Sequence, residues 1–343
     1  MVINFNSSVL IGRNILSHQI KLLKGKKIVL VISPTPDNLF GVLFKNILLK
    51  KIIITNNNLK EIKKLANKKE LKDCEIIVGF GAGTCLDIAK TLAHLNSKYL
   101  IAIPSVLSCN VFATNKSVIT QNKKAKTIDS KIPDKIIIEL ELFKKTNERF
   151  IFSGLADALS IYTALYDWEL AIKSKKEKED KLIMNFARSI LYSVLENYSH
   201  FFNINEQTIQ ELSKVLLLSG YITNIYGSGR PESGSEHMFS RAIEESGLYN
   251  KKILHGETVM LGILLCSELQ KRSDKRLYDI AARMSLISTL NRLNLDRKKI
   301  ADLLLTASTI RLERYSIFNK VHLNKGKSLR IANKVMNKLE NDK

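Results

Sequence analysis

Short runs of apolar, mostly β-branched residues alternate with helical patterns in the first half of the chain. These runs predict strands at 27–32, 51–55, 75–79, 99–104 and 135–139. Between them, residues 58–69 and 84–95 show the three- and four-residue apolar spacing of a helix with one buried face. Strands that alternate with helices along a chain predict a largely parallel sheet covered by helices.

From about residue 150 the pattern changes to longer amphipathic segments without convincing strands. These segments predict helices at 155–173, 182–201, 209–225, 258–271 and 275–293. A chain of 343 residues also exceeds the usual size of one core. We therefore predict an α/β nucleotide-binding domain over residues 1–149 and an all-α domain over residues 150–343, with a cleft between them available as a site. The Lys- and Asn-rich end, from Asn324, is expected to fray.

Lysine and arginine outnumber aspartate and glutamate, 54 to 33, which gives a formal net charge of +21. Such an excess permits a nucleic-acid partner, an anionic membrane surface or a phosphorylated substrate. Most of it is lysine on presumed outer helix faces, as at 173–181 and 320–338, without the aromatic residues or motifs of nucleic-acid binding. We therefore expect a solvated basic surface and no nucleic-acid partner. No apolar stretch is as long as a bilayer span, so no membrane insertion is expected.

The four cysteines, Cys74, Cys85, Cys109 and Cys266, show no CxxC spacing and are too sparse for a disulfide framework. Reduced thiols are therefore expected. The first residues lack a basic region followed by an apolar run and a cleavage site. Together these features predict a cytoplasmic protein.

A glycine-rich turn, Gly81-Ala82-Gly83-Thr84, separates the predicted strand at 75–79 from the predicted helix at 84–95. Glycines let backbone N–H groups approach phosphate oxygens closely, and a helix N-terminus adds unpaired donors and partial positive charge. The turn therefore predicts a diphosphate site, although a strand-to-helix turn without a ligand is the alternative. The full GxGxxG fingerprint is absent because Leu86 stands at the third glycine position.

One carboxylate and two imidazoles stand in unusual settings in the helical half. Asp157 follows Gly154 just inside a predicted helix, and His237 and His255 stand near predicted helix starts beside serines or glycines. Three such ligands with open coordination positions are typical of a catalytic metal site. Zn²⁺, Fe²⁺ and Ni²⁺ all accept this set, and we expect one divalent ion, with zinc first. The other histidines are interpreted as structural or surface residues: His18, His94, His200 and His322.

Several segments, met in order between residues 28 and 262, resemble the signatures of the glycerol-1-phosphate dehydrogenases. They are the glycine loop with its helix at 81–90, Ile103-Pro104-Ser105 with Ser108, the stretches 154–157 and 166–171, and the motifs 230–237 and 254–257. This family lies in the superfamily of iron-containing alcohol dehydrogenases, glycerol dehydrogenases and 3-dehydroquinate synthases. The resemblance implies the dehydroquinate synthase-like fold, with an α/β nucleotide-binding domain, an all-α domain and the site in the cleft.

The resemblance also implies roles for individual residues. Residues implied to bind NAD or NADP are Gly81, Ala82, Gly83, Thr84, Asp87, Ser105, Ser108 and Thr114. Residues implied to hold the metal and to act in catalysis are Asp157, His237 and His255. Residues implied to contact substrate are Asn110, Lys116, Asp157 and Arg241.

Three positions depart from the family pattern. Asn110 replaces an aspartate that contacts substrate, and Arg241 replaces a second histidine four residues after the first metal histidine. An arginine there favours an anionic substrate group, while pairing with Glu244 or Glu245 on its own helix is the alternative. After the first strand, the run 33–37 replaces the usual acidic partner of the ribose, so NAD and NADP are not separated.

The resemblance implies a metal-dependent oxidoreductase that interconverts a ketone phosphate, such as dihydroxyacetone phosphate, and a secondary alcohol phosphate. One alternative is a 3-dehydroquinate synthase-like cyclase, whose usual carboxylate ligand is Glu where this chain has Asp157. A polyol or alcohol dehydrogenase is another. A basic binding protein without catalysis is a third, indicated only by Asn110 and Arg241. We expect a small phosphorylated or anionic substrate. A homo-oligomer is compatible with the sequence.

Overall fold

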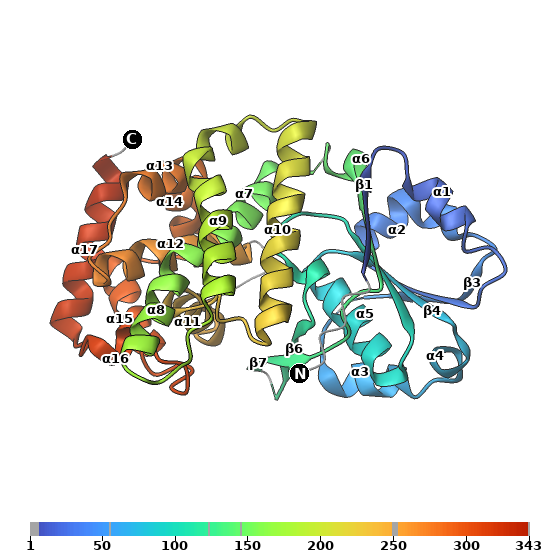
Figure 1. The fold of residues 1–343 in the computed structure, drawn as a ribbon, viewed down its shortest axis with the longest axis horizontal. Helices are drawn as coiled ribbons and strands as arrows, with labels where there is room; N and C mark the ends of the chain where they lie inside the picture. The colour runs from blue at the N-terminus through green and yellow to red at the C-terminus, as the bar shows by residue number, and fades with distance from the viewer. Residues whose placement is uncertain (1–6, 55, 123, 145, 249–252, 342–343) are drawn as a thin grey trace. The chain divides into compact units, whose positions relative to one another are not determined.

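A computed structural model describes residues 7–341, with the exception of residues 55, 123, 145 and 249–252 (Figure 1). Contacts divide the chain into two compact units. The first comprises Met1–Asn147 and Asn205–Tyr221, and the second comprises Glu148–Ile204 and Ile222–Lys343. The predicted division after residue 149 stays a prediction, and most of one long helix, α10 (Glu206–Tyr226), groups with the first unit.

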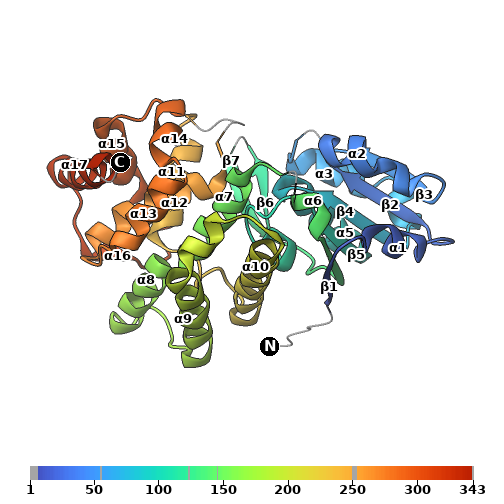
Figure 2. The ribbon, with the colours of Figure 1, turned by 90° about the horizontal axis from the view of Figure 1, so that it is seen from above.

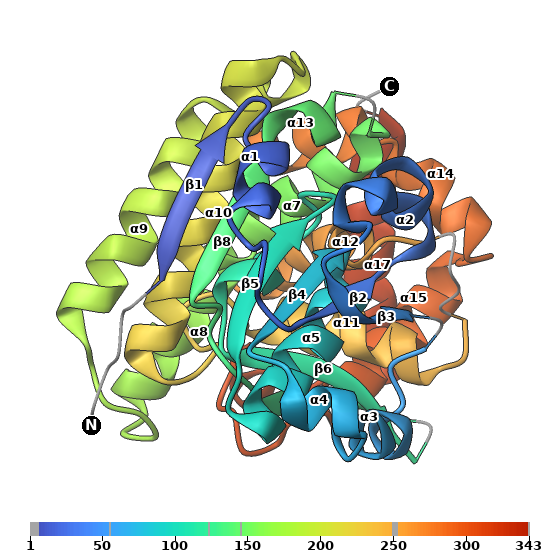
Figure 3. The same cartoon turned by 90° about the vertical axis from the view of Figure 1, so that its right-hand side faces the viewer.

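A six-stranded parallel sheet forms the centre of the first unit. Its strands, in spatial order, are β1 (Ser8–Gly12), β8 (Lys135–Glu139), β5 (Tyr99–Pro104), β4 (Ile76–Gly81), β2 (Ile28–Ile32) and β3 (Leu48–Ile53) (Figure 3). β2 and β4 are buried along their whole length because they lie inside the sheet and both faces are covered. Residue 55, the last of the predicted strand 51–55, lies outside the described residues.

Helices cover both faces of this sheet. On one face, Leu30 and Phe80 pack with α1 (Leu16–Lys21), α2 (Pro34–Phe40) and η1 (Gly41–Phe44). On the other face, Val31 and Ile77 pack with α3 (Leu59–Ala66), α4 (Lys69–Asp73) and α5 (Gly83–Asn96). The α/β architecture expected from the alternating pattern is therefore present.

Several elements of the first unit are absent from the sequence prediction. β1 is one, and an antiparallel hairpin of β6 (Lys116–Gln121) and β7 (Lys124–Asp129) is another. The short helices η2 (Val111–Ala113) and α6 (Leu140–Phe143) complete the unit.

The second unit is built of helices throughout its described residues (Figure 2). They are α7 (Glu148–Leu159), α8 (Ile161–Lys173), α9 (Lys181–Glu196), η3 (Tyr198–Phe202), α11 (Ser235–Glu245), α12 (His255–Leu269), α13 (Lys275–Arg283), α14 (Leu286–Arg292), α15 (Arg297–Ala307), α16 (Ile317–Lys320) and α17 (Lys325–Asn341). The all-α character expected of the second half is confirmed. Among the described residues, no helix combines the length and apolar character needed to cross a bilayer.

Two expectations about helices were wrong in detail. The segment predicted as one helix at 155–173 is divided at Ser160, between α7 and α8. The segment predicted at 275–293 is divided at Met284 and Ser285, between α13 and α14. The end of the chain does not fray over the described residues, because α17 is tied to α12. Lys334 and Lys338 of α17 both form ion pairs with the buried Glu268.

Candidate metal and cofactor sites

Asp157, His237 and His255 converge on one point within the second unit. One ligand atom of each lies within 4.8 Å of the others. Oδ1 of Asp157 is 3.6 Å from Nε2 of His237 and 3.8 Å from Nε2 of His255. Ligand atoms about 2.1 Å from a tetrahedral zinc ion lie about 3.4 Å apart. The separations therefore fit a single divalent cation bound by three protein atoms.

The outer nitrogen of each histidine faces a carboxylate. Nδ1 of His237 lies 2.8 Å from Oε1 of Glu236, and Nδ1 of His255 lies 3.6 Å from Oε1 of Glu244. A carboxylate in this position fixes the tautomer and turns the other ring nitrogen toward a metal. The sequence analysis did not assign either glutamate as a partner of a metal histidine. The position of Glu236 directly before His237 could have suggested that role.

The electrostatics of the cluster favour positive charge. Burial lowers the pKa of His237, but hydrogen bonds and charges from Asp157 and Glu236 outweigh burial and raise the pKa to about 9. A site that holds a proton on an imidazole so strongly also attracts a metal cation. The side chain of His255 is 35% exposed, which leaves a path for a small molecule to reach an open coordination position.

Close helix packing sets the positions of the three side chains. His237 lies in the first turn of α11 and His255 is the first residue of α12, as predicted, but Asp157 lies in the last turn of α7 rather than near a helix start. Two glycines let α12 approach its neighbours. A Cβ on Gly256 would stand 2.1 Å from the carbonyl oxygen of Ser153 in α7, and one on Gly262 would stand 2.5 Å from that of Glu236 in α11.

A buried polar network supports the start of α11. Asp167 accepts hydrogen bonds from the backbone N–H groups of Ser235 and Ile317, at 2.7 Å and 2.8 Å. Glu236 accepts one from Thr163 Oγ1, at 2.6 Å. Burial and the charge of Glu236 raise the pKa of Asp167 to about 6. The motifs around Asp167 and Glu236 thus have a structural reason, because they fix the backbone that carries His237.

The glycine loop lies in the first unit, where β4 ends and α5 begins. Helix α5 starts at Gly83 without a side-chain cap among the described residues, since Ala82 occupies the N-cap position. A Cβ on Gly83 would meet only Cys109 Sγ at 3.8 Å and Val111 Cγ1 at 3.9 Å. Both are ordinary van der Waals distances, so packing alone does not require a glycine here, and an uncapped helix N-terminus fits a diphosphate.

Asp87 and Lys90 form a buried pair one turn into α5. The Asp87 side chain is 9% exposed and its Oδ1 lies 3.5 Å from Lys90 Nζ, and burial raises the pKa of Asp87 to about 6. Lys90 also donates to the carbonyl oxygens of Val111 and Thr114, at 2.9 Å and 3.3 Å. The side chain of Asp87 therefore faces Lys90. Thr114, which is expected near the cofactor, accepts a hydrogen bond from the same lysine. Lys116 pairs with Asp129 across the β6–β7 hairpin.

The segment after β5 lies beside the glycine loop in space. The backbone N–H of Ser105 donates to the carbonyl oxygen of Gly81, at 3.0 Å, so these two expected cofactor residues are neighbours. Ser108 and Asn110 follow Ser105 in the same segment. Asn110 is 8% exposed and donates to Ser219 Oγ of α10, at 3.1 Å.

Arg241 lies one turn after His237 on α11, with a side chain that is 14% exposed. Its Nε is 3.5 Å from Oε1 of Glu245. A pair with Glu244 or Glu245 on the same helix was the alternative to a substrate contact in the sequence analysis. That separation is longer than a good charge-assisted hydrogen bond, so the pair is weak.

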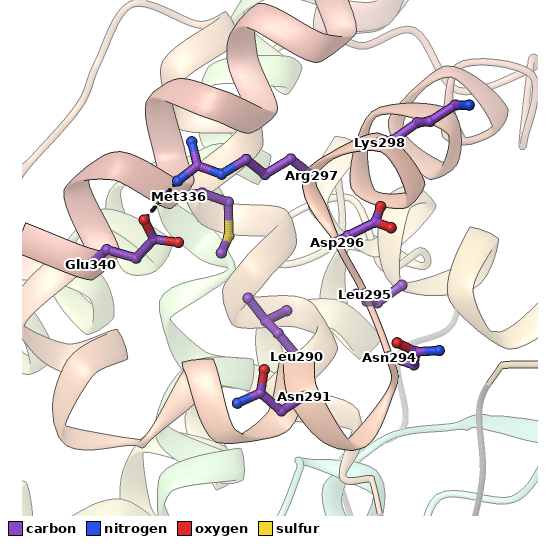
Figure 4. Close-up of a pocket in the computed structure, with 9 residues that line it drawn as sticks. All are labelled: Leu290, Asn291, Asn294, Leu295, Asp296, Arg297, Lys298, Met336 and Glu340. Carbon is purple, nitrogen blue, oxygen red and sulfur yellow. Dashed lines mark hydrogen bonds and ion pairs between the residues drawn. The ribbon is translucent and has the colours of Figure 1, made fainter.

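A groove of about 560 Å³ lies elsewhere on the second unit, over α14, α15 and α17 (Figure 4). Arg297 and Glu340 form an ion pair beside it, at 2.6 Å. The described residues that line it include none of those expected to bind metal, cofactor or substrate.

Comparisons with known proteins agree on the family. The sequence profile described as iron-containing alcohol dehydrogenase matches residues 11–146. The glycerol-1-phosphate dehydrogenase (NAD(P)+) of Methanosarcina mazei is 28% identical over 284 residues, covering 83% of this chain and 78% of that protein. That of Pyrococcus horikoshii is 27% identical over 329 residues, covering 93% and 94%. A crystal structure of a probable glycerol dehydrogenase from Sinorhizobium meliloti has a TM-score of 0.79 at 15% identity, covering 98% of each chain, and so shares the fold.

The matching profile is that of the iron-containing alcohol dehydrogenases, and the crystal structure shows the same fold. Over most of its length the chain is similar to glycerol-1-phosphate dehydrogenases, as its motifs predict. The predicted resemblance and the predicted fold class are confirmed.

Proposed function

We propose that this chain is a metal-dependent, NAD(P)-linked dehydrogenase that interconverts a ketone phosphate, such as dihydroxyacetone phosphate, and a secondary alcohol phosphate. The convergence of Asp157, His237 and His255 carries the proposal, because this donor set suits a catalytic divalent cation. The substrate class follows from the relatives, which are named glycerol-1-phosphate dehydrogenases.

In this proposal Asp157, His237 and His255 hold the cation, with zinc proposed first and iron or nickel as alternatives. When bound, a divalent cation polarises the carbonyl oxygen of the substrate, and the nicotinamide ring supplies or accepts the hydride. Glu236 keeps the imidazole of His237 in the tautomer whose Nε2 faces the cation, and Glu244, 3.6 Å from Nδ1 of His255, adds negative charge beside the second imidazole.

Residues of the first unit would bind the nucleotide. Backbone N–H groups of Gly81, Ala82, Gly83 and Thr84 are proposed to bind the diphosphate, because α5 offers unpaired donors there. Ser105, Ser108 and Thr114 are proposed on the nicotinamide side. Asp87 is proposed to belong to the same cofactor site, and its ion-pair partner is Lys90, on the same helix.

Asn110, Lys116 and Arg241 are proposed to contact substrate. Arg241 supplies positive charge one turn from His237, which suits a phosphorylated substrate. Asn110 is held by Ser219 and is neutral, so it adds a polar contact without the charge of the aspartate usual in the family. A cytoplasmic location and a homo-oligomeric state remain predictions.

The test is oxidation of NADH and NADPH, followed by absorbance, against dihydroxyacetone phosphate, other ketone phosphates and their unphosphorylated counterparts. The protein is used metal-stripped and after reconstitution with Zn²⁺, Fe²⁺ or Ni²⁺. We expect turnover of a ketone phosphate that depends on metal. Turnover of no ketone phosphate by any reconstituted form would contradict the proposal.

A further inference from the structure

Two arginines that no sequence motif singles out lie together in the second unit. Arg311 and Arg314 both stand on the connection between α15 and α16, at 308–316. Arg311 Nη1 donates to Ser233 Oγ, at 3.3 Å, and Arg314 Nη1 donates to the carbonyl oxygen of Ser233, at 2.7 Å. Ser233 lies in the loop just before α11, so both guanidinium groups are held beside the start of the helix that carries His237.

The positive charge of these two residues is not neutralised by a direct partner. Neither guanidinium group forms an ion pair with a carboxylate among the residues that the structure describes. Burial and the charges of Arg314 and Arg241 lower the pKa of Arg311 to about 10. Burial and the charge of Arg230 likewise lower the pKa of Arg314. Both arginines are half-buried, and two like charges held on one residue without a carboxylate partner in the described part of the chain attract an anion to the side that solvent can reach.

The backbone at Arg311 adopts an uncommon conformation. Its φ is +52°, in the left-handed region that non-glycine residues other than Asn and Asp rarely adopt. Such a conformation costs on the order of 1 kcal/mol and is found where surrounding structure requires it. Here it accompanies a side chain that is directed to Ser233 rather than to solvent.

The contacts with Ser233 place the arginines on the approach to the proposed metal ligands, because Ser233 lies four positions before His237. The charge of Glu244, which faces Nδ1 of His255, raises the pKa of Arg311, although this attraction does not outweigh the lowering effects. The charge of Glu236, which faces Nδ1 of His237, acts in the same way on Arg314. The two guanidinium groups are therefore held at the start of the helix that carries His237.

We propose that Arg311 and Arg314, oriented by Ser233, bind the phosphate group of the substrate while the carbonyl end of the same molecule lies at Asp157, His237 and His255. This inference rests on the proposed function. A guanidinium group has five N–H donors in a planar fork that matches phosphate oxygens, and the contact with Ser233 uses one nitrogen of each. The pair would select ketone phosphates over uncharged ketones.

The experiment compares dihydroxyacetone phosphate with dihydroxyacetone as substrates of the metal-loaded enzyme. Arg311→Met and Arg314→Met are each expected to raise the KM for the phosphorylated ketone by about 30-fold, while kcat/KM for dihydroxyacetone and the KM for NAD(P)H stay unchanged. Arg188→Met is the matched control, because Arg188 is an exposed arginine of the same unit that pairs with Glu169. Arg311→Lys should recover part of the loss because it restores the charge without the fork.

An equal loss for both ketones, or no loss for either, would overturn the inference. A second measurement separates it from the proposed function: calorimetric titration of inorganic phosphate into metal-loaded protein saturated with NADH, so that the glycine loop is occupied. Heat of binding that disappears in Arg311→Met supports the anion site even if no ketone phosphate is turned over. Binding that is unchanged in Arg311→Met and Arg314→Met overturns it even if the wild type is active.

Discussion

Nδ1 of His237 lies 2.8 Å from Oε1 of Glu236, the residue directly before it in the chain. Glu236 is fully buried, and its two oxygens also accept from the backbone N–H of Gly234 and from Thr163 Oγ1, at 2.6 Å each. The carboxylate cannot turn away from the imidazole without losing both contacts. The orientation of His237 is therefore set before any cation arrives.

Replacing Glu236 by Gln should weaken metal binding by about 10–100-fold, because the amide is a poorer acceptor and makes the imidazole less basic. Competition with a chromogenic chelator measures the affinity. Glu169→Gln is the control, since Glu169 is an exposed glutamate that pairs with Arg188. Equal affinity in the Glu236 and Glu169 variants would show that Glu236 serves only the fold.

His255→Ala should leave the protein folded but without its metal, because one of three ligands is lost from an open site. Elemental analysis after dialysis is expected to give about one divalent ion per chain for the parent and far less for the variant. His322→Ala, at an exposed histidine, should bind as much metal as the parent. A metal-loaded His255→Ala protein would refute the ligand assignment.

Gly83→Val should abolish measurable NAD(P)H binding with little change in melting temperature. The Cβ would meet its neighbours only at ordinary contact distance, so the fold should tolerate it, but the branched side chain would stand at the start of α5, where the diphosphate is proposed to bind. Gly79→Ala gives the opposite pattern, because its Cβ would stand 2.6 Å from that of Ala89 and cost roughly 1–3 kcal/mol of stability. Calorimetric titration and thermal unfolding of both variants distinguish a ligand loop from a packed turn.

Arg241→Met should raise the KM for a phosphorylated ketone by an amount corresponding to roughly 2–4 kcal/mol, through loss of positive charge near the substrate. Glu245→Gln removes the same ion pair but keeps the arginine, and should leave the KM unchanged. If the two variants behave alike, Arg241 acts only through its pair on α11, which is worth about 0.2–0.5 kcal/mol.

Glu268 should contribute stability that disappears in acid. Burial raises its pKa, but hydrogen bonds from Lys334, Lys338 and other neighbours outweigh burial and lower the pKa from 4.5 to about 2. The contribution is complete above pH 4.5 and is lost as the pH falls toward 2. Glu268→Gln should lower the free energy of unfolding at pH 7 by about 1–3 kcal/mol and flatten its decline in acid. Glu340→Gln, at an exposed carboxylate of α17, should do neither.

The sequence predicted elements well where burial produces a simple pattern. The strands at 99–104 and 135–139 were predicted at their observed bounds, because apolar residues dominate them. The β6–β7 hairpin was missed because its two strands are rich in lysine and other polar residues, which hide the apolar alternation of a strand. β1 was missed because its pairing partner, β8, begins more than 120 residues later, at Lys135. The break at Ser160 was missed because helical spacing continues through it.

Of the candidate site, the sequence could indicate the three proposed metal ligands, since Asp and His beside glycines are uncommon. It could not indicate Arg311 and Arg314. In a chain with 54 basic residues, two more arginines carry no signal by themselves. Only the fold brings them to Ser233, 78 and 81 positions earlier in the sequence, and leaves them without an acidic partner among the described residues.

The glycines at 256 and 262 have a consequence for how the protein acquires its metal. Since α12 presses directly on the backbones of α7 and α11, the three ligand side chains stand on a nearly incompressible frame. Little movement of the helices should therefore accompany metal loading, and the spacing of the three ligand atoms is set by the packing of the polypeptide rather than by the ion. A cation that suits this spacing would bind without deforming the site, whereas one of unsuitable size could not be accommodated by a shift of the helices.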